Sequence, residues 1–270
     1  MNKQHIKNGK VLLQITSGNL SRLLSHWGRH TEISAHELSK KLDEVEIGAG
    51  FKSCSFDYKG RRVRLSGKHA IPLAIDIFGL NQYEFLKGEK TIVDIGANIG
   101  DTAIYFALNG TEKVYAFEPY PYSFRMMKKN LAESGMNGNI ETFMAGLGSA
   151  SGAITLTEDE IGAEADLVAA KEGKNIPITT LDEIAKRHNL KDASLKIDCD
   201  GDVDIINGAS DDTLLRFRKI ELETAHAEQI AKRFDNKNWK VVHEMKRRDK
   251  GNKETLHNCF DLLMIERVQK

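Results

Sequence analysis

The residues best suited to chemistry lie in the run Asp-Ile-Gly-Ala-Asn-Ile-Gly-Asp-Thr between Asp94 and Thr102. An apolar stretch precedes this run and a helical pattern follows it, so we expect a strand, a tight turn and a helix. Glycines in the turn allow close approaches that a side chain would block, so a ligand can lie against the backbone. The amides that open the helix suit an anionic group. A turn without a ligand is the alternative. The residues predicted to border the ligand are Asp94, Gly96, Ala97, Asn98, Gly100 and Thr102.

A second acidic position follows the next apolar stretch. The sequence Val-Tyr-Ala-Phe indicates a strand that ends in Glu118 and Pro119. In nucleotide-binding α/β folds an acid at the end of the second strand, roughly 20 residues past the turn, binds the ribose hydroxyls. We therefore predict that Glu118 grips a vicinal diol, with a solvated strand end as the alternative. By analogy with the fold, Met144 and Ala145 are the predicted neighbours of the ligand's base.

Several motifs, in this order, resemble the FkbM-type family of methyltransferases. The resemblance covers residues 70–223 and rests on Val93–Thr102, Phe117–Pro119, Asn130-Leu131, Thr179–Asp182 and Leu195–Gly201. It implies S-adenosylmethionine as the methyl donor and O-methylation of a hydroxyl on a sugar, glycolipid or natural product. Tyr83 resembles a family position near the donor. The family usually has Glu where Asp200 stands, so the substrate geometry of this chain stays open.

Acid–base candidates follow the fourth and fifth predicted strands. Asp198 stands at a strand's carboxyl end, where open α/β sheets place their ligand crevice, and Asp200 follows it. Both are candidates for acceptor binding or for the base, with turn chemistry as the alternative. His226 is a further candidate base, and a surface histidine is its alternative. Glu221 and Glu223 share one strand face and can point to the same crevice. A divalent-metal site among these residues is disfavoured, because no dense ligand motif supports it.

The spacing of apolar residues predicts the elements that position these side chains. Strands are expected at Thr91–Ile95, Lys113–Phe117, Ile140–Ala145, Leu195–Asp198, Lys219–Leu222, Trp239–His243 and Phe260–Ile265. Helices are expected at Asp101–Asn109, Tyr122–Ser134, Leu181–His188, Asp211–Arg218 and Ala227–Asn236. The long interval from Gly148 to Thr180 is expected to contain a hairpin of Ala153–Thr157 with Asn175–Thr179. The fold class is thus α/β, a Rossmann-like methyltransferase fold whose mostly parallel seven-stranded sheet ends in an antiparallel hairpin closed by Lys246–Thr255.

The first third of the chain has a different pattern. Apolar residues at helical spacing predict a helix within Ser17–Leu42, and alternation about Lys59-Gly60 predicts a β-hairpin over Ser55–Leu65. Helical periodicity returns over Ala70–Leu86. We therefore expect a helical and β-hairpin extension in residues 1–88 and a donor-binding domain in residues 89–270.

The balance of charges limits the classes of partner that the chain is expected to bind. Lys+Arg and Asp+Glu are each 39, so no long-range field favours nucleic acid or an anionic membrane. We expect a small-molecule or glycan acceptor, no nucleic acid and no stable membrane insertion, and an oligomer is compatible with the sequence. The three isolated cysteines argue against a disulfide framework, and no signal-peptide core is present, so a cytoplasmic location is expected.

Three rival functions are weighed against this prediction. An NAD-dependent dehydrogenase would share the sheet and the ribose acid, but Asn98 occupies the place of the middle glycine of its motif. A nucleic-acid methyltransferase would be expected to have a basic surface, whereas the charges of this chain balance. A non-catalytic S-adenosylmethionine-binding protein is supported only by the unusual acidic run that begins at Asp200.

Overall fold

The computed structural model describes residues 5–7, 10–12, 43–47, 52–67, 69–136, 138–157, 169–246 and 261–268. The helix predicted within Ser17–Leu42 lies outside these residues, as does the connection that follows Lys246. None of the described helices is both long and apolar enough to cross a lipid bilayer.

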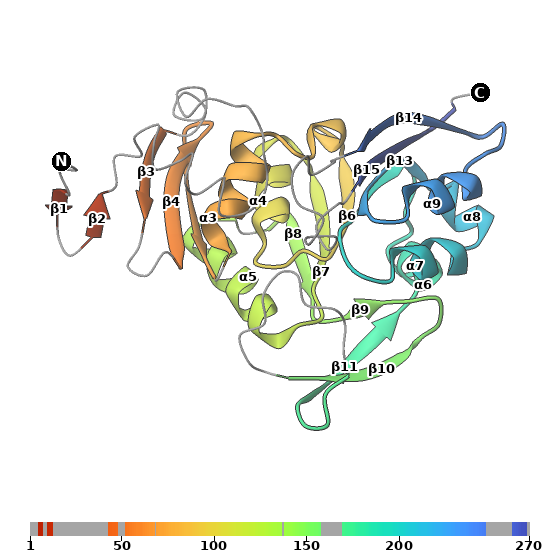
Figure 1. Cartoon of the computed structure of the whole chain (residues 1–270), viewed down its shortest axis with the longest axis horizontal. Helices are drawn as coiled ribbons and strands as arrows, with labels where there is room; N and C mark the ends of the chain where they lie inside the picture. Colours follow the sequence, from red (N-terminus) through yellow and green to blue (C-terminus); the bar gives the residue numbers. More distant parts are fainter. Residues whose placement is uncertain are drawn as a thin grey trace, which may run out of the picture.

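The centre of the molecule is a seven-stranded sheet (Figure 1). Its spatial order is β14-β15-β13-β12-β6-β7-β8, in which β15 runs antiparallel to both of its neighbours and the pairs from β13 to β8 are parallel. This confirms the predicted Rossmann-like fold with an antiparallel terminal hairpin. The strands are β6 (Thr91–Ile95), β7 (Lys113–Phe117), β8 (Ile140–Phe143), β12 (Ala193–Ile197), β13 (Phe217–Thr224), β14 (Trp239–Lys246) and β15 (Asp261–Arg267).

Helices cover both faces of the sheet, so its central strands are apolar on both sides. On β6, Ile92 packs in one core with the helices of one face, whereas Val93 and Ile95 pack in a second core with the helices of the other. The first face carries α4 (Asp101–Leu108) and α5 (Pro121–Glu133). The second carries α6 (Leu181–Arg187), α7 (Asp202–Gly208), α8 (Asp211–Leu214) and α9 (Ala227–Arg233).

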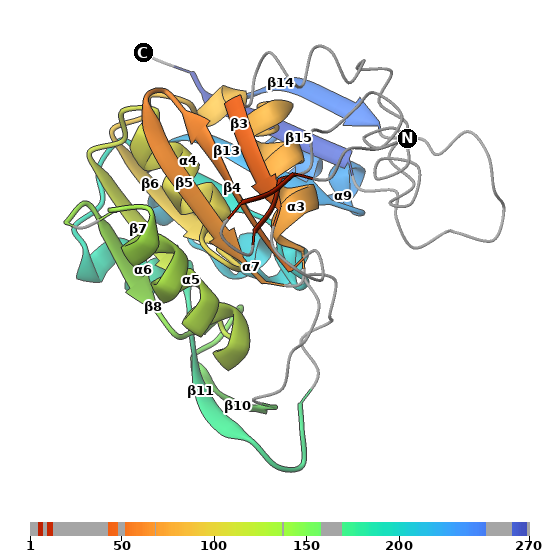
Figure 2. The same ribbon diagram turned by 90° about the vertical axis from the view of Figure 1, so that its left-hand side faces the viewer.

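A separate five-stranded sheet of order β1-β2-β3-β4-β5 stands at the amino-terminal end (Figure 2). The predicted hairpin is confirmed as β4 and β5, which turn at Lys59-Gly60, where both residues have positive φ. The β5 backbone is tied to α5, because Ser66 donates its N–H to Asn130 Oδ1 at 2.8 Å. The division into residues 1–88 and 89–270 remains a prediction, and the two parts share one core. The elements are β1 (His5–Lys7), β2 (Lys10–Leu12), β3 (Asp43–Ile47), β4 (Ser53–Tyr58) and β5 (Arg61–Ser66).

The helical periodicity over Ala70–Leu86 corresponds to three short helices that lead into β6. These are α3 (Ala70–Leu73), the π-helix η2 (Ala74–Gly79) and the 3-10 helix η3 (Glu84–Leu86). The predicted inner hairpin is confirmed as β10 (Gly152–Leu156) against β11 (Lys174–Thr179), which also pairs with β9 (Gly146–Leu147).

Two predicted elements end earlier than expected, and one helix was not predicted. The strand expected over Ile140–Ala145 ends at Phe143. The helix expected over Asp211–Arg218 ends at Leu214, because the buried Phe217 already belongs to β13. The helix α7 was not predicted at all, since Asp200-Gly201 indicates a turn; Gly201 adopts φ +83° and caps the helix that follows.

Candidate functional site

The predicted site residues meet at the carboxyl edge of the central sheet, where β6 lies between β7 and β12. Asp94 lies in β6, Glu118 directly follows β7 and Asp198 directly follows β12. The chain leaves β6 for α4 on one face and β12 for α7 on the other, so the strand order reverses here. Open α/β sheets bind their ligands at such a switch point.

The turn after β6 has left-handed backbone at Gly96 (φ +75°), Asn98 (φ +46°) and Gly100 (φ +85°). A Cβ at Gly96 would lie 2.0 Å from the carbonyl oxygen of Asp198, and one at Gly100 would lie 2.9 Å from Met127 Cγ. Both glycines are therefore required by close packing within the chain. That a ligand also rests on this turn remains a prediction.

Glu118 joins the two turns that follow β6 and β7. Its carboxylate is buried, and it accepts the Asn98 N–H on Oε2 and the Tyr120 N–H on Oε1, each at 2.9 Å. Burial raises the pKa of Glu118 to about 7, although the two N–H groups act to lower it. Each carboxylate oxygen retains acceptor capacity beyond these bonds.

Lys196, one residue before the carboxyl end of β12, contacts several groups at the centre of the site and was not among the predicted residues. Its side chain is 1% exposed, and Nζ lies 2.8 Å from the Gly96 carbonyl oxygen and 3.1 Å from Asp94 Oδ1. Burial acts to lower the pKa of Lys196, but the neighbouring carboxylates outweigh it and keep the amine charged. The signal in the sequence is a lysine between Leu195 and Ile197 in an otherwise apolar strand. An unpaired lysine would be expensive there.

Lys196 also forms an ion pair with Asp198 at the edge of the site, where Nζ lies 3.7 Å from Asp198 Oδ2. The hydroxyl of Tyr83 donates to this oxygen at 2.9 Å. Tyr83 is fully buried, whereas the Asp198 side chain is 41% exposed. Burial, followed by the charge of Asp198, raises the pKa of Tyr83, so the phenol remains a hydrogen-bond donor. Asp94 is fixed on its other side by the Thr102 hydroxyl, which donates to Oδ2 at 2.6 Å.

A sequence model of the FkbM methyltransferase domain matches residues 94–249, which contain all of these strand ends. The chain belongs to the FkbM methyltransferase family. A curated relative, the methyltransferase sdnD of Sordaria araneosa, is 26% identical over 174 residues. The match covers 58% of this chain and 65% of that protein, so the chain spans less than two thirds of the relative's length.

Solved structures of low sequence identity resemble the chain. A proposed S-adenosylmethionine-dependent methyltransferase from Streptococcus mutans has 12% identity and a TM-score of 0.49, over 80% of this chain and 56% of that one. An rRNA methylase from Streptococcus thermophilus has 14% identity and a TM-score of 0.43, over 69% and 91%. TrmK of M. capricolum, in complex with S-adenosylhomocysteine, has 14% identity and a TM-score of 0.45, over 71% and 69%.

In this FkbM-family chain the candidate base His226 directly precedes α9, which packs beside α7. Its side chain is 55% exposed, and Nδ1 lies 3.5 Å from Oδ1 of the buried Asp202. A carboxylate on one imidazole nitrogen orients the ring and leaves the other nitrogen outward. Asp202 was not predicted as a partner, because its position inside a helix was missed. Asp200 is exposed on the turn before α7.

The remaining predicted residues also follow the ends of β6, β7 and β8. The Glu118 N–H donates to the Phe143 carbonyl at 3.1 Å, so Pro119, Met144 and Ala145 leave neighbouring strands at the same edge. Ala97 and Ala145 are buried, whereas Pro119 and Met144 are half-buried. On β13, Glu221 is fully buried, and the half-buried Glu223 accepts a hydrogen bond from Gln82.

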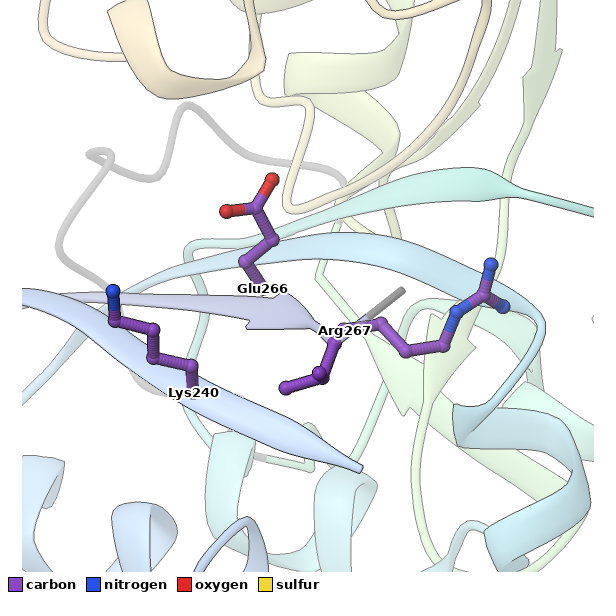
Figure 3. A pocket seen from close by; sticks show the side chains of 4 residues that line it. Lys240, Glu266 and Arg267 are labelled. Atoms are coloured by element: carbon purple, nitrogen blue, oxygen red, sulfur yellow. The ribbon is translucent and has the colours of Figure 1, made fainter. Parts of the chain in front are cut away.

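A shallow hollow of about 250 Å³ lies elsewhere, on the terminal hairpin (Figure 3). It is lined by Lys240, Glu266, Arg267 and Val268. Glu266 pairs with Lys219 near the start of β13, so the hollow lies at the amino edge of the sheet, opposite the carboxyl ends. We therefore do not assign the donor to it. Within the described ranges, no group of three or more His, Cys, Asp or Glu residues is arranged to hold a metal ion.

Proposed function

We propose that this chain transfers a methyl group from S-adenosylmethionine to a hydroxyl of a sugar, a glycolipid or a small natural product. The observation that carries the proposal is Glu118, a buried carboxylate held by backbone amides of two strand-end turns. A carboxylate fixed in this way can accept both hydroxyls of a ribose. Membership of the FkbM methyltransferase family supports the same donor.

The charges at the carboxyl edge fit this donor. The carboxyl groups of Asp94, Asp101, Glu118 and Asp198 cluster about a single buried lysine, Lys196. A donor with an ammonium and a sulfonium would bring positive charge to these acids. When bound, the donor supplies a methyl carbon on a sulfur that is a good leaving group. Residues proposed to hold it are Asp94, Gly96, Ala97, Asn98, Gly100, Thr102, Glu118, Pro119, Met144 and Ala145.

Asp198 is the first candidate for binding the acceptor hydroxyl. Tyr83 and Lys196 both engage its Oδ2, which fixes the side chain and leaves Oδ1 for the acceptor. Methyl transfer from a sulfonium depends mainly on alignment of the two reactants and on a group that takes the hydroxyl proton. Asp198, Asp200 or His226 would take that proton. Of these, His226 has a carboxylate partner that orients its ring.

Calorimetry with S-adenosylmethionine and S-adenosylhomocysteine tests the donor site. We expect both to bind. We expect Glu118→Ala to weaken binding by roughly 1–3 kcal/mol, because the ribose hydroxyls lose the carboxylate proposed to accept their hydrogen bonds. Asp212→Asn, on the exposed first turn of α8, serves as a control that should bind like wild type. If neither compound binds to the wild-type protein, the proposed function is wrong.

Labelled methyl transfer to a panel of sugars, glycolipids, natural-product alcohols and structured RNA tests the acceptor. We expect transfer to a hydroxyl compound and none to RNA, since the chain has no net charge. Asp198→Asn should keep donor affinity and reduce turnover by roughly 10²–10⁴-fold if this carboxylate is the base. Wild-type turnover in that variant would exclude Asp198 as the base. Tight donor binding without transfer to any compound would favour the non-catalytic alternative.

A further inference from the structure

One buried acid of the cluster about Lys196 takes part in none of the hydrogen bonds or ion pairs described so far. Asp101 is the first residue of α4 and directly follows Gly100 of the turn. The residue is 2% exposed, and its Oδ1 has no hydrogen-bond partner among the residues that the structure describes. A buried carboxylate oxygen without a partner is costly, so a native protein rarely keeps one without a function.

The surroundings of Asp101 do not supply the missing charge. Burial raises its pKa to about 7; Lys196 and the residue's own backbone N–H act to lower it, and Asp94 and Asp198 raise it further. Lys196 already pairs with Asp94 at 3.1 Å and bonds to the Gly96 carbonyl. In the donor-free molecule the Asp101 carboxylate therefore lies beside one shared cation and two competing acids.

We propose that Asp101 is the counter-charge for a cationic group of the methyl donor. The inference rests on the proposed function, since it requires the donor to lie at the carboxyl ends of β6 and β7. The shared chemistry is a buried carboxylate against a cation, which is either the ammonium or the sulfonium of S-adenosylmethionine. S-adenosylhomocysteine retains the ammonium and lacks the sulfonium, so the two compounds separate these sources.

Calorimetry at pH 8 with Asp101→Asn provides the test. Asparagine keeps the shape of the side chain and removes its charge, so we expect roughly 10- to 100-fold weaker binding of S-adenosylmethionine. The matched control is Asp212→Asn, an aspartate in the first turn of α8 that is exposed to solvent. This control should bind both compounds like wild type. Asp101→Ser, which keeps a small oxygen-bearing side chain, repeats the test without an amide.

Each outcome decides the inference. An equal loss for both compounds assigns the ammonium, and a loss confined to S-adenosylmethionine assigns the sulfonium; either supports the counter-charge. Wild-type affinity for both compounds in Asp101→Asn and Asp101→Ser overturns it. If the wild-type protein binds neither compound, the proposed function is wrong, and this result is distinct from a failure of the counter-charge inference.

Thermal unfolding of the donor-free variants separates the counter-charge from a structural role. The substitution removes an uncompensated buried charge, so at pH 8 Asp101→Asn should melt at or above the wild-type temperature. Saturating S-adenosylmethionine should raise the melting temperature less in the variant than in wild type. A lower donor-free melting temperature together with weaker binding in both variants would assign a structural role and overturn the inference.

Discussion

At the amino edge of the central sheet Glu89 is buried among cations, whereas at the carboxyl edge Asp101 and Glu118 are buried with one shared lysine. Glu89 contacts Arg218 and Lys219 and accepts the Ser194 hydroxyl at 3.0 Å. Burial acts to raise the pKa of Glu89, but these partners outweigh it and lower the pKa. The pKa values of Asp101 and Glu118 are instead raised to about 7.

The difference separates a structural acid from acids that suit a ligand. The chain compensates Glu89 by itself, so nothing need bind there. At the carboxyl edge one lysine, Lys196, faces Asp94, Asp101 and Asp198, and acids with such raised pKa values are typical of functional sites. All three acids are buried, and Glu89 differs from Asp101 and Glu118 in having two cationic partners of its own.

Removing the lysine of the carboxyl edge should have the largest effect. Lys196→Met leaves Asp94 buried without its cation, so we expect the free energy of unfolding to fall by about 3–5 kcal/mol. Urea denaturation at pH 7.5 measures it. Lys219→Met, at the other edge, leaves Arg218 beside Glu89 and should cost less. Equal losses in the two variants would contradict the contrast between the edges.

A matched pair of glutamate substitutions should separate the two roles. Glu118→Gln is expected to weaken S-adenosylmethionine binding by roughly 1–3 kcal/mol, because the proposed ribose contact loses its charge. Glu89→Gln is expected to lower the melting temperature and to leave donor affinity unchanged, since it lies at the opposite edge. Calorimetry and thermal unfolding on both proteins give the comparison. Weaker donor binding in Glu89→Gln but not in Glu118→Gln would reverse the assignment.

The pH dependence of stability should have opposite signs at the two edges. Asp101 and Glu118 have raised pKa values, so their stabilising contribution is present at low pH and is lost as the pH rises through about 7. Glu89 has a lowered pKa, so its contribution is present above 4.5 and is lost as the pH falls.

We therefore expect the donor-free protein to lose about 1–2 kcal/mol per raised acid between pH 5.5 and pH 7. Urea denaturation across this range measures the slope. Glu118→Gln should reduce the slope, and saturating S-adenosylmethionine should do the same in wild type. A slope that is the same in wild type and in this variant would refute the raised pKa of Glu118.

The smallest effect is expected from a single hydroxyl at the amino edge. Ser194→Ala removes one hydrogen bond to Glu89 and leaves both cations in place, so the free energy of unfolding should fall by about 0.5–1.5 kcal/mol. Donor affinity should not change. Weaker binding of S-adenosylhomocysteine in this variant would show that the two edges are coupled.

Much of the fold could be predicted from local pattern. The strands at Thr91–Ile95 and Lys113–Phe117 have the predicted bounds, because each is a short apolar run between clear turns. The helix α7 was not predicted in this way, since it directly follows Asp200-Gly201, a pair that indicates a turn, and begins in an acidic run. Its absence from the prediction also concealed the contact of Asp202 with His226.

The sequence by itself determined which elements form, which acids end the strands and which family the chain resembles, because these depend on neighbours along the chain. Only the tertiary structure decided how the acids are compensated. The Lys196 ammonium meets the Gly96 carbonyl across 100 residues, and the Tyr83 hydroxyl meets Asp198 across 115. The strand order of the sheet brings β6 beside β12, and the energy of a buried charge depends on the groups that surround it in space.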